Sequence, residues 1–284
     1  MRVKEKKKDN LRGIVSNIIC KTPSVYKVIK NRECCPSTKF VVKICNDKYS
    51  HGSKLYSEVK LGMANLAKLC EICDDFCQLY KLDCRIDDKM FVFCPDDEIC
   101  MDCHDISEKE LDNIKFLEEK HIGSVGALAI HALAFVIFHE MGHVKYDDDK
   151  MLQIEKERTA DFFAMNVLYG LCDESRDVQL DRNPRLLGAF LANIWVLLVS
   201  KPKDAEIATS HPHPIERIYL FLEYFHIKDD SFLWEYAYNT IEKWANENDI
   251  NMTFVKDSSL SLKDKLLDVY LRSLLSNKSW LIGL

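Results

Sequence analysis

An apolar stretch, Val125 to Phe138, constrains this chain more than any other feature, because it runs directly into the pentapeptide HEMGH at positions 139–143. The stretch contains no charged residue and is too short to cross a bilayer as a helix. We therefore expect a buried helix over residues 123–146 that carries two histidines near its end. Any fold must surround this helix with other apolar elements.

Composition is that of a soluble globular protein. The chain has 284 residues, of which 47% are apolar and 30% are charged, and its net charge is −6. The negative charge argues against nucleic acid as the main partner. The basic start, MRVKEKKKDN, is followed by no apolar segment of the kind that a secretory signal needs. We expect a cytoplasmic protein with no membrane partner, and a mobile basic tail at residues 1–10.

Apolar periodicity predicts an α+β fold that is predominantly α-helical. Strands are expected at 25–29, 39–45 and 88–94, and a helical face at 54–82. Helices are expected at 107–121, 123–146, 152–169, 184–200, 212–226, 230–246 and 261–276. The predicted organisation is a small β-containing N-terminal lobe (1–106), a helical core (107–228) and C-terminal helices packing on that core (229–284).

The two histidines of the pentapeptide can bind one metal ion. Residues four apart lie on the same face of a helix, so His139 and His143 can both reach an ion at a distance of about 2 Å. Glu140 lies about 100° further round and can reach a water beside the ion. Gly142 leaves room for close packing or for a substrate backbone. The alternative is a buried helix with incidental histidines, although buried ionisable groups without partners are costly.

A hydrolytic zinc site needs a third protein ligand, and two candidates follow the pentapeptide. Asp149 fits an extended zincin spacing, but that pattern needs a glycine where Tyr146 stands, because the chain must turn sharply there. Glu157 lies on the next expected helix and is the favoured ligand. Asp161, four residues on, can accept the outer N–H of a zinc-bound histidine. The alternative for this segment is a solvated acidic helix face.

Three motifs in order resemble the gluzincin peptidases, and most of all the U49 peptidases of bacterial phage exclusion. They are HExxH at 139–143, ExxAD at 157–161, and the segment SHPHPIERI at 210–218, which looks like HPxxxERI. The resemblance covers about residues 125–226. It implies a zincin-like catalytic core and one catalytic Zn²⁺ ion held by His139, His143 and Glu157, with Glu140 as the general base.

The third motif implies further site residues. His211 is expected near the metal, where it would steady the oxyanion, and Arg217 is expected to have a structural role. His213 is an additional histidine, so the sequence leaves open which of the two faces the metal. The alternative is that both are exposed in a proline-rich turn before a helix.

The resemblance also implies a partner. It points to cleavage of a cytoplasmic protein, such as a translation elongation factor, and to a phage-derived trigger. Two other classes stay open: a non-catalytic zinc-binding sensor or interaction module, and a helical interaction protein without metal.

Eleven of the twelve cysteines precede residue 104. Cys70-x-x-Cys73 and Cys100-x-x-Cys103 could hold a structural metal. However, Cys70, Cys73 and Cys77 fall on an apolar helix face, where cysteine acts as a small hydrophobic residue.

Overall fold

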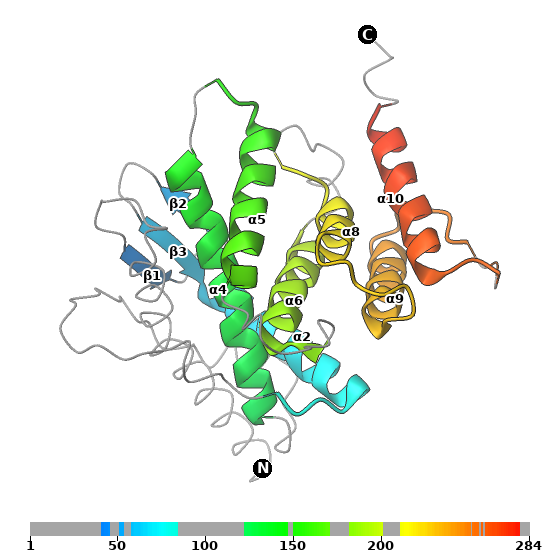
Figure 1. Ribbon diagram of the computed structural model, residues 1–284, viewed down its shortest axis with the longest axis horizontal. Coiled ribbons are helices and arrows are strands. Elements are labelled where there is room, and N and C mark those ends of the chain that lie inside the picture. The colour runs from blue at the N-terminus through cyan, green and yellow to red at the C-terminus, as the bar shows by residue number, and fades with distance from the viewer. Residues whose placement is uncertain are drawn as a thin grey trace.

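The computed structural model describes residues 41–45, 51–53, 58–84, 122–146, 150–170, 182–200, 211–250, 252–255, 257 and 259–278. These residues are predominantly helical, as predicted (Figure 1). The strands are β1 (Val41–Cys45), β2 (His51–Ser53) and β3 (Glu58–Gly62), and the helices are α2 (Met63–Tyr80), α4 (Ile122–Tyr146), α5 (Gln153–Gly170), α6 (Pro184–Val199), α8 (Pro214–Tyr224), α9 (Phe232–Glu247) and α10 (Leu262–Lys278).

Helix α4 is the centre of the structure, with α2, α5 and α6 packed around it (Figure 1). Every residue from Ser124 to His139 is buried. A helix that is apolar on all sides is either a membrane span or a core helix. By length and composition the segment Gly123–His143 could cross a membrane, but 94% of its most apolar window is buried inside the fold. The prediction of a buried helix over 123–146 is confirmed.

Two glycines allow the neighbouring helices to approach very closely. A Cβ atom added to Gly188 of α6 would lie 2.4 Å from the Cβ of His131 on α4. A Cβ atom added to Gly142 would lie 2.7 Å from the Cα of Ala160 on α5. The space predicted at Gly142 therefore serves helix packing, and it fixes α5 against the end of α4.

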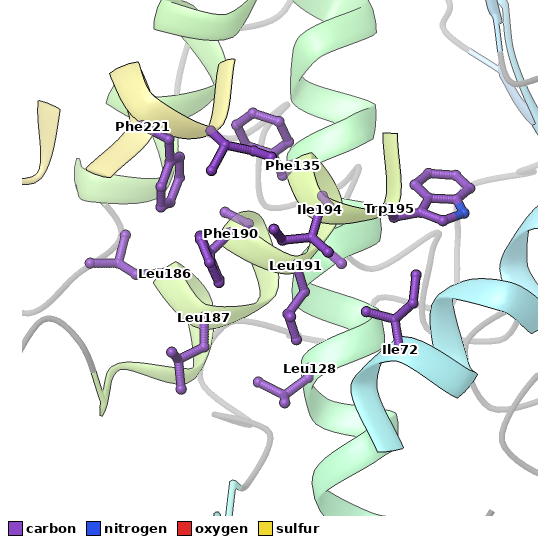
Figure 2. Close-up of a cluster of buried hydrophobic side chains, with 14 of the residues drawn as sticks. Ile72, Leu128, Phe135, Leu186, Leu187, Phe190, Leu191, Ile194, Trp195 and Phe221 are labelled. Carbon is purple, nitrogen blue, oxygen red and sulfur yellow. The ribbon is translucent and has the colours of Figure 1, made fainter. Parts of the chain in front are cut away.

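An aromatic and aliphatic core joins α8 and α2 to the central helices. Figure 2 shows Phe135 and Leu128 of α4 facing Phe190 of α6, Phe221 of α8 and Ile72 of α2. The ring centroids of Phe135 and Phe221 lie 6.3 Å apart, with the ring planes at 84°, which is an edge-to-face contact. This packing places the start of α8 beside the end of α4.

The C-terminal helices α9 and α10 cover the side of α6 and α8 (Figure 1). Trp234, Tyr238 and Trp244 of α9 are buried. These aromatic residues of α9 therefore belong to the core. Lys263 of α10 forms an ion pair of 2.7 Å with Glu223, near the end of α8.

The three strands form one sheet in the order β1-β3-β2, in which β1 runs parallel and β2 antiparallel to β3. The helical face expected over 54–82 is shorter than predicted, because α2 begins only at Met63. Residues 58–62 are extended instead. Val59 and Leu61 alternate there with polar residues, which is the strand period, and the helical spacing begins at Leu66.

Several predictions stay untested. The expected strands at 25–29 and 88–94, the helix at 107–121 and the basic tail at 1–10 lie outside the described residues. The separate N-terminal lobe, the zincin-like core and the domain boundaries stay predictions.

Candidate metal centre

The end of α4 and the first turns of α5 bring three potential ligands together. The Nε2 atoms of His139 and His143 lie 3.1 Å apart. Glu157 Oε2 lies 3.4 Å from His139 Nε2, and Glu157 Oε1 lies 3.3 Å from His143 Nε2. In the described part of the chain, this is the one group of three histidine, cysteine or carboxylate ligand atoms within 4.8 Å of one another. The sequence predicted these three residues as the ligand set.

The three residues His139, His143 and Glu157 form a triangle whose size suits a zinc ion. A tetrahedral ion with bonds of about 2.0–2.1 Å holds its ligand atoms about 3.3–3.4 Å apart. The nearest atoms of the three residues lie 3.1, 3.3 and 3.4 Å apart, with His139 facing Glu157 Oε2 and His143 facing Glu157 Oε1. One ligand atom from each residue lies within 4.8 Å of the other two, which is close to the spacing around zinc. Two imidazoles and one carboxylate are also a known zinc donor set that leaves a position open for water.

Asp161 orients the first of the two histidines. The Nδ1 atom of His139 lies 2.8 Å from Asp161 Oδ1, which leaves Nε2 facing the triangle. Arg217 of α8 donates to the same oxygen of Asp161. The role predicted for Asp161 therefore has its partner in place, and Arg217 holds Asp161 in turn.

Charge balance in this cluster shifts the pKa values of its members. Burial lowers the pKa of His139, but the charge of Asp161 and hydrogen bonds to Asp161 and Glu157 outweigh burial and raise it to about 9. Burial raises the pKa of Glu157, but hydrogen bonds from His139 and His143 hold it well below the ordinary value. Burial likewise raises the pKa of Asp161, and the charges of Arg217 and His139 lower it overall. Without a metal, the protonated ring of His139 lies between the two carboxylates, with Nδ1 facing Asp161 and Nε2 facing Glu157.

The residues before α8 settle which histidine faces the triangle. His211 Nε2 lies 3.3 Å from Glu157 Oε1, and the His211 side chain is 63% exposed. His213 is buried and caps α8, where its Nδ1 accepts the N–H of Ile215 over 3.2 Å. Burial lowers the pKa of His213 to about 4. His211 therefore lies at the potential metal site, and His213 stabilises the start of the helix.

Sequence reasoning missed an ion pair between the second and third motifs. Arg158 donates from Nε and Nη2 to Glu216 Oε1, over 2.9 and 2.6 Å. The spacing of residues gives no signal for it, because Arg158 and Glu216 lie on separate helices, α5 and α8. Glu140, the predicted general base, is half-buried next to His139 on α4. Asp149, the disfavoured third ligand, lies outside the described residues.

Four cysteines, three on α2 and one shortly after it, behave as apolar residues. Cys70, Cys73, Cys77 and Cys84 are buried free thiols. Burial raises the pKa of Cys70 and of Cys77 to about 12, so both stay protonated at neutral pH. Among the described residues these thiols form no group of three ligand atoms within 4.8 Å of one another, which favours the apolar interpretation. Cys100 and Cys103 lie outside the described residues.

Comparison with known proteins agrees with these motifs. No curated protein and no solved structure shows significant similarity to the chain. One family matches, described as Peptidase U49, over residues 105–237. That range contains all three motifs, and the match confirms the resemblance of this region to the U49 peptidases.

Proposed function

We propose that this protein is a zinc-dependent endopeptidase with His139, His143 and Glu157 as its metal ligands. The observation that carries the proposal is the convergence of these three residues, whose nearest ligand atoms lie 3.1–3.4 Å apart, a spacing that suits a tetrahedral zinc ion. The match to Peptidase U49 supports a peptidase independently of that geometry.

The reaction assigns a role to each residue around the triangle. Zinc, when bound, polarises a carbonyl and lowers the pKa of water toward neutrality. Glu140 accepts a proton from the attacking water and passes it to the leaving nitrogen of the peptide. Asp161 holds the ring of His139 in one tautomer. His211 donates a hydrogen bond to the carbonyl oxygen as negative charge develops there.

Metal content and proteolysis together test the proposal. The purified protein should contain about one zinc ion per chain, and the His143→Ala variant should lose it, because a site of three ligands cannot spare one. Proteolysis is measured on a cell lysate by mass spectrometry of new N-termini. Glu140→Gln should keep the zinc and lose the cleavage. Full cleavage by Glu140→Gln would refute the mechanism, and zinc without cleavage in the wild type would favour a non-catalytic zinc-binding module.

The substrate we propose is a cytoplasmic protein, with a translation elongation factor as the first candidate because of the U49 resemblance. Cleavage should then give one discrete product pair when the purified factor is mixed with the wild type. A phage-derived trigger is part of the same proposal, so the assay is run with and without phage lysate. An intact factor under both conditions would remove this candidate.

A further inference from the structure

The interface between α5 and α8 contains two ion pairs, Arg217 with Asp161 and Arg158 with Glu216, and the second includes none of the proposed ligands. Arg158 donates two hydrogen bonds to Glu216 Oε1. The Glu216 side chain is 2% exposed, whereas the Arg158 side chain is 43% exposed. Desolvating a carboxylate costs much of what its ion pair returns, so such a pair adds little net stability. It does restrict how two helices align, because few arrangements satisfy the buried carboxylate.

Apolar packing beside the ion pair is interrupted by a pocket, so it constrains the alignment of α5 and α8 less. A pocket lies against the pair, lined among others by Phe162 and Met165 of α5 and by Leu220 and Phe221 of α8. Close-packed side chains hold neighbouring helices in one register, and a pocket removes part of that constraint. The charged contacts between α5 and α8 therefore help to set the register of the two helices.

His211 is attached to this aligned segment by a short, stiff connection. Proline restricts the backbone at positions 212 and 214, and His213 caps the helix between them. Because His211 lies only two residues before the N-cap His213, its position beside Glu157 depends on where α8 begins. We propose that the Arg158–Glu216 ion pair is a positioning device that holds His211 at the metal site. This inference rests on the role proposed for His211.

The test follows the histidine rings themselves and does not depend on proteolysis. Full-length protein with ¹³C-labelled histidine rings is titrated with Zn²⁺ alone and observed by NMR, and single His→Ala variants assign the signals. In the wild type, the signals of His139, His143 and His211 should all shift. In Glu216→Gln, which keeps the shape and removes the charge, the two ligand histidines should still shift and the His211 shift should be lost.

Two further variants separate positioning from general stability. Replacing both partners with apolar residues, Arg158→Met with Glu216→Leu, should keep the urea midpoint at or above that of the wild type and still lose the His211 shift. The matched control is Glu223→Gln, which removes the ion pair with Lys263 near the other end of α8. The control should keep the His211 shift.

Each outcome decides between the alternatives. A His211 shift that persists in Glu216→Gln and in the apolar double variant overturns the proposal, as does its loss in the Glu223→Gln control. No His211 shift in the wild type also overturns it. If His139 and His143 do not shift either, zinc does not bind there, and the proposed function fails as well.

Where the wild type cleaves a lysate protein, a double-mutant cycle gives a second measurement. Glu216→Gln and His211→Ala should lower kcat by the same factor and leave KM unchanged. Combining them should lower kcat no further, because the ion pair acts through His211. If the double variant lowered kcat by the product of the two separate factors, the proposal would be contradicted.

Discussion

Replacing Gly142 with alanine tests the link between helix packing and metal binding. The new Cβ would lie 2.7 Å from Ala160 Cα, 3.1 Å from its Cβ and 3.2 Å from its carbonyl oxygen. Carbon atoms in contact normally stay about 3.5–4.0 Å apart, so the shortest contact lacks about 1 Å. The Cα belongs to the backbone and no rotamer change can relieve it. Helix α5 must therefore shift away from α4.

The expected cost can be set against a matched control on the same helix. Overpacking costs about 1–3 kcal/mol, and the change from glycine to alanine returns about 1 kcal/mol of helix propensity. Gly126→Ala gains the same propensity without a clash, because among the described residues, apart from the adjacent backbone of α4 itself, no atom lies within 4 Å of its new Cβ. We expect Gly142→Ala to lower the free energy of unfolding of the metal-free protein and Gly126→Ala to raise it, with a difference of about 1–3 kcal/mol between them.

Zinc affinity should decrease together with stability in Gly142→Ala, because Glu157 lies one turn before Ala160 on α5, the helix that must shift. We expect Gly142→Ala to weaken zinc binding about tenfold or more, and Gly126→Ala to leave it unchanged. Urea unfolding measures the stability, and competition with a chelator measures the affinity. Equal stability changes of the same sign in both variants would refute the close approach of α4 and α5.

Three further predictions concern the same region. Asp161→Asn should weaken zinc binding about 10- to 100-fold, because the support of His139 loses its charge, and chelator competition would show this; unchanged affinity would contradict the role of Asp161. The metal-free protein should lose stability as pH falls from 6.5 toward 4, because His213 binds a proton in the unfolded chain at a higher pH than in the folded one. The pKa of about 4 in the fold corresponds to a loss of about 3 kcal/mol in the free energy of unfolding. The His213→Asn variant should flatten this part of the plot of urea midpoint against pH. Zinc at about 100 times its Kd should raise the free energy of unfolding by about 2.7 kcal/mol over the metal-free protein, and an unchanged urea midpoint would show that the fold binds no zinc.

The sequence was sufficient where one local period decides the structure. The apolar run before His139 predicts α4, and the four-residue spacing to His143 places both rings on one face. It was insufficient where two periods compete, and residues 58–62 form β3 although a helical face was expected there. The conformation of a short segment depends on the elements that it pairs with, and β3 lies between β1 and β2 in the sheet.

Contacts between side chains on separate helices were the other feature that the sequence could not predict. Charged residues on separate helices show no shared period, so nothing in the spacing pairs Arg158 with Glu216. The two histidines of the third motif flank the same proline, and both suit a metal equally well on paper. His213 stands directly before Pro214, the first position of α8, where a capping side chain is usual, and that signal could have separated them.

The proton on His139 has a consequence for how this protein would take up metal. With a pKa of about 9, that ring is cationic at neutral pH, and its charge stands in for an ion between Glu157 and Asp161. Metal uptake is then an exchange, because the imidazole must release its proton before it can coordinate. Calorimetric heats of zinc binding should therefore depend on the ionisation enthalpy of the buffer, and zinc occupancy should decrease as the solution is acidified.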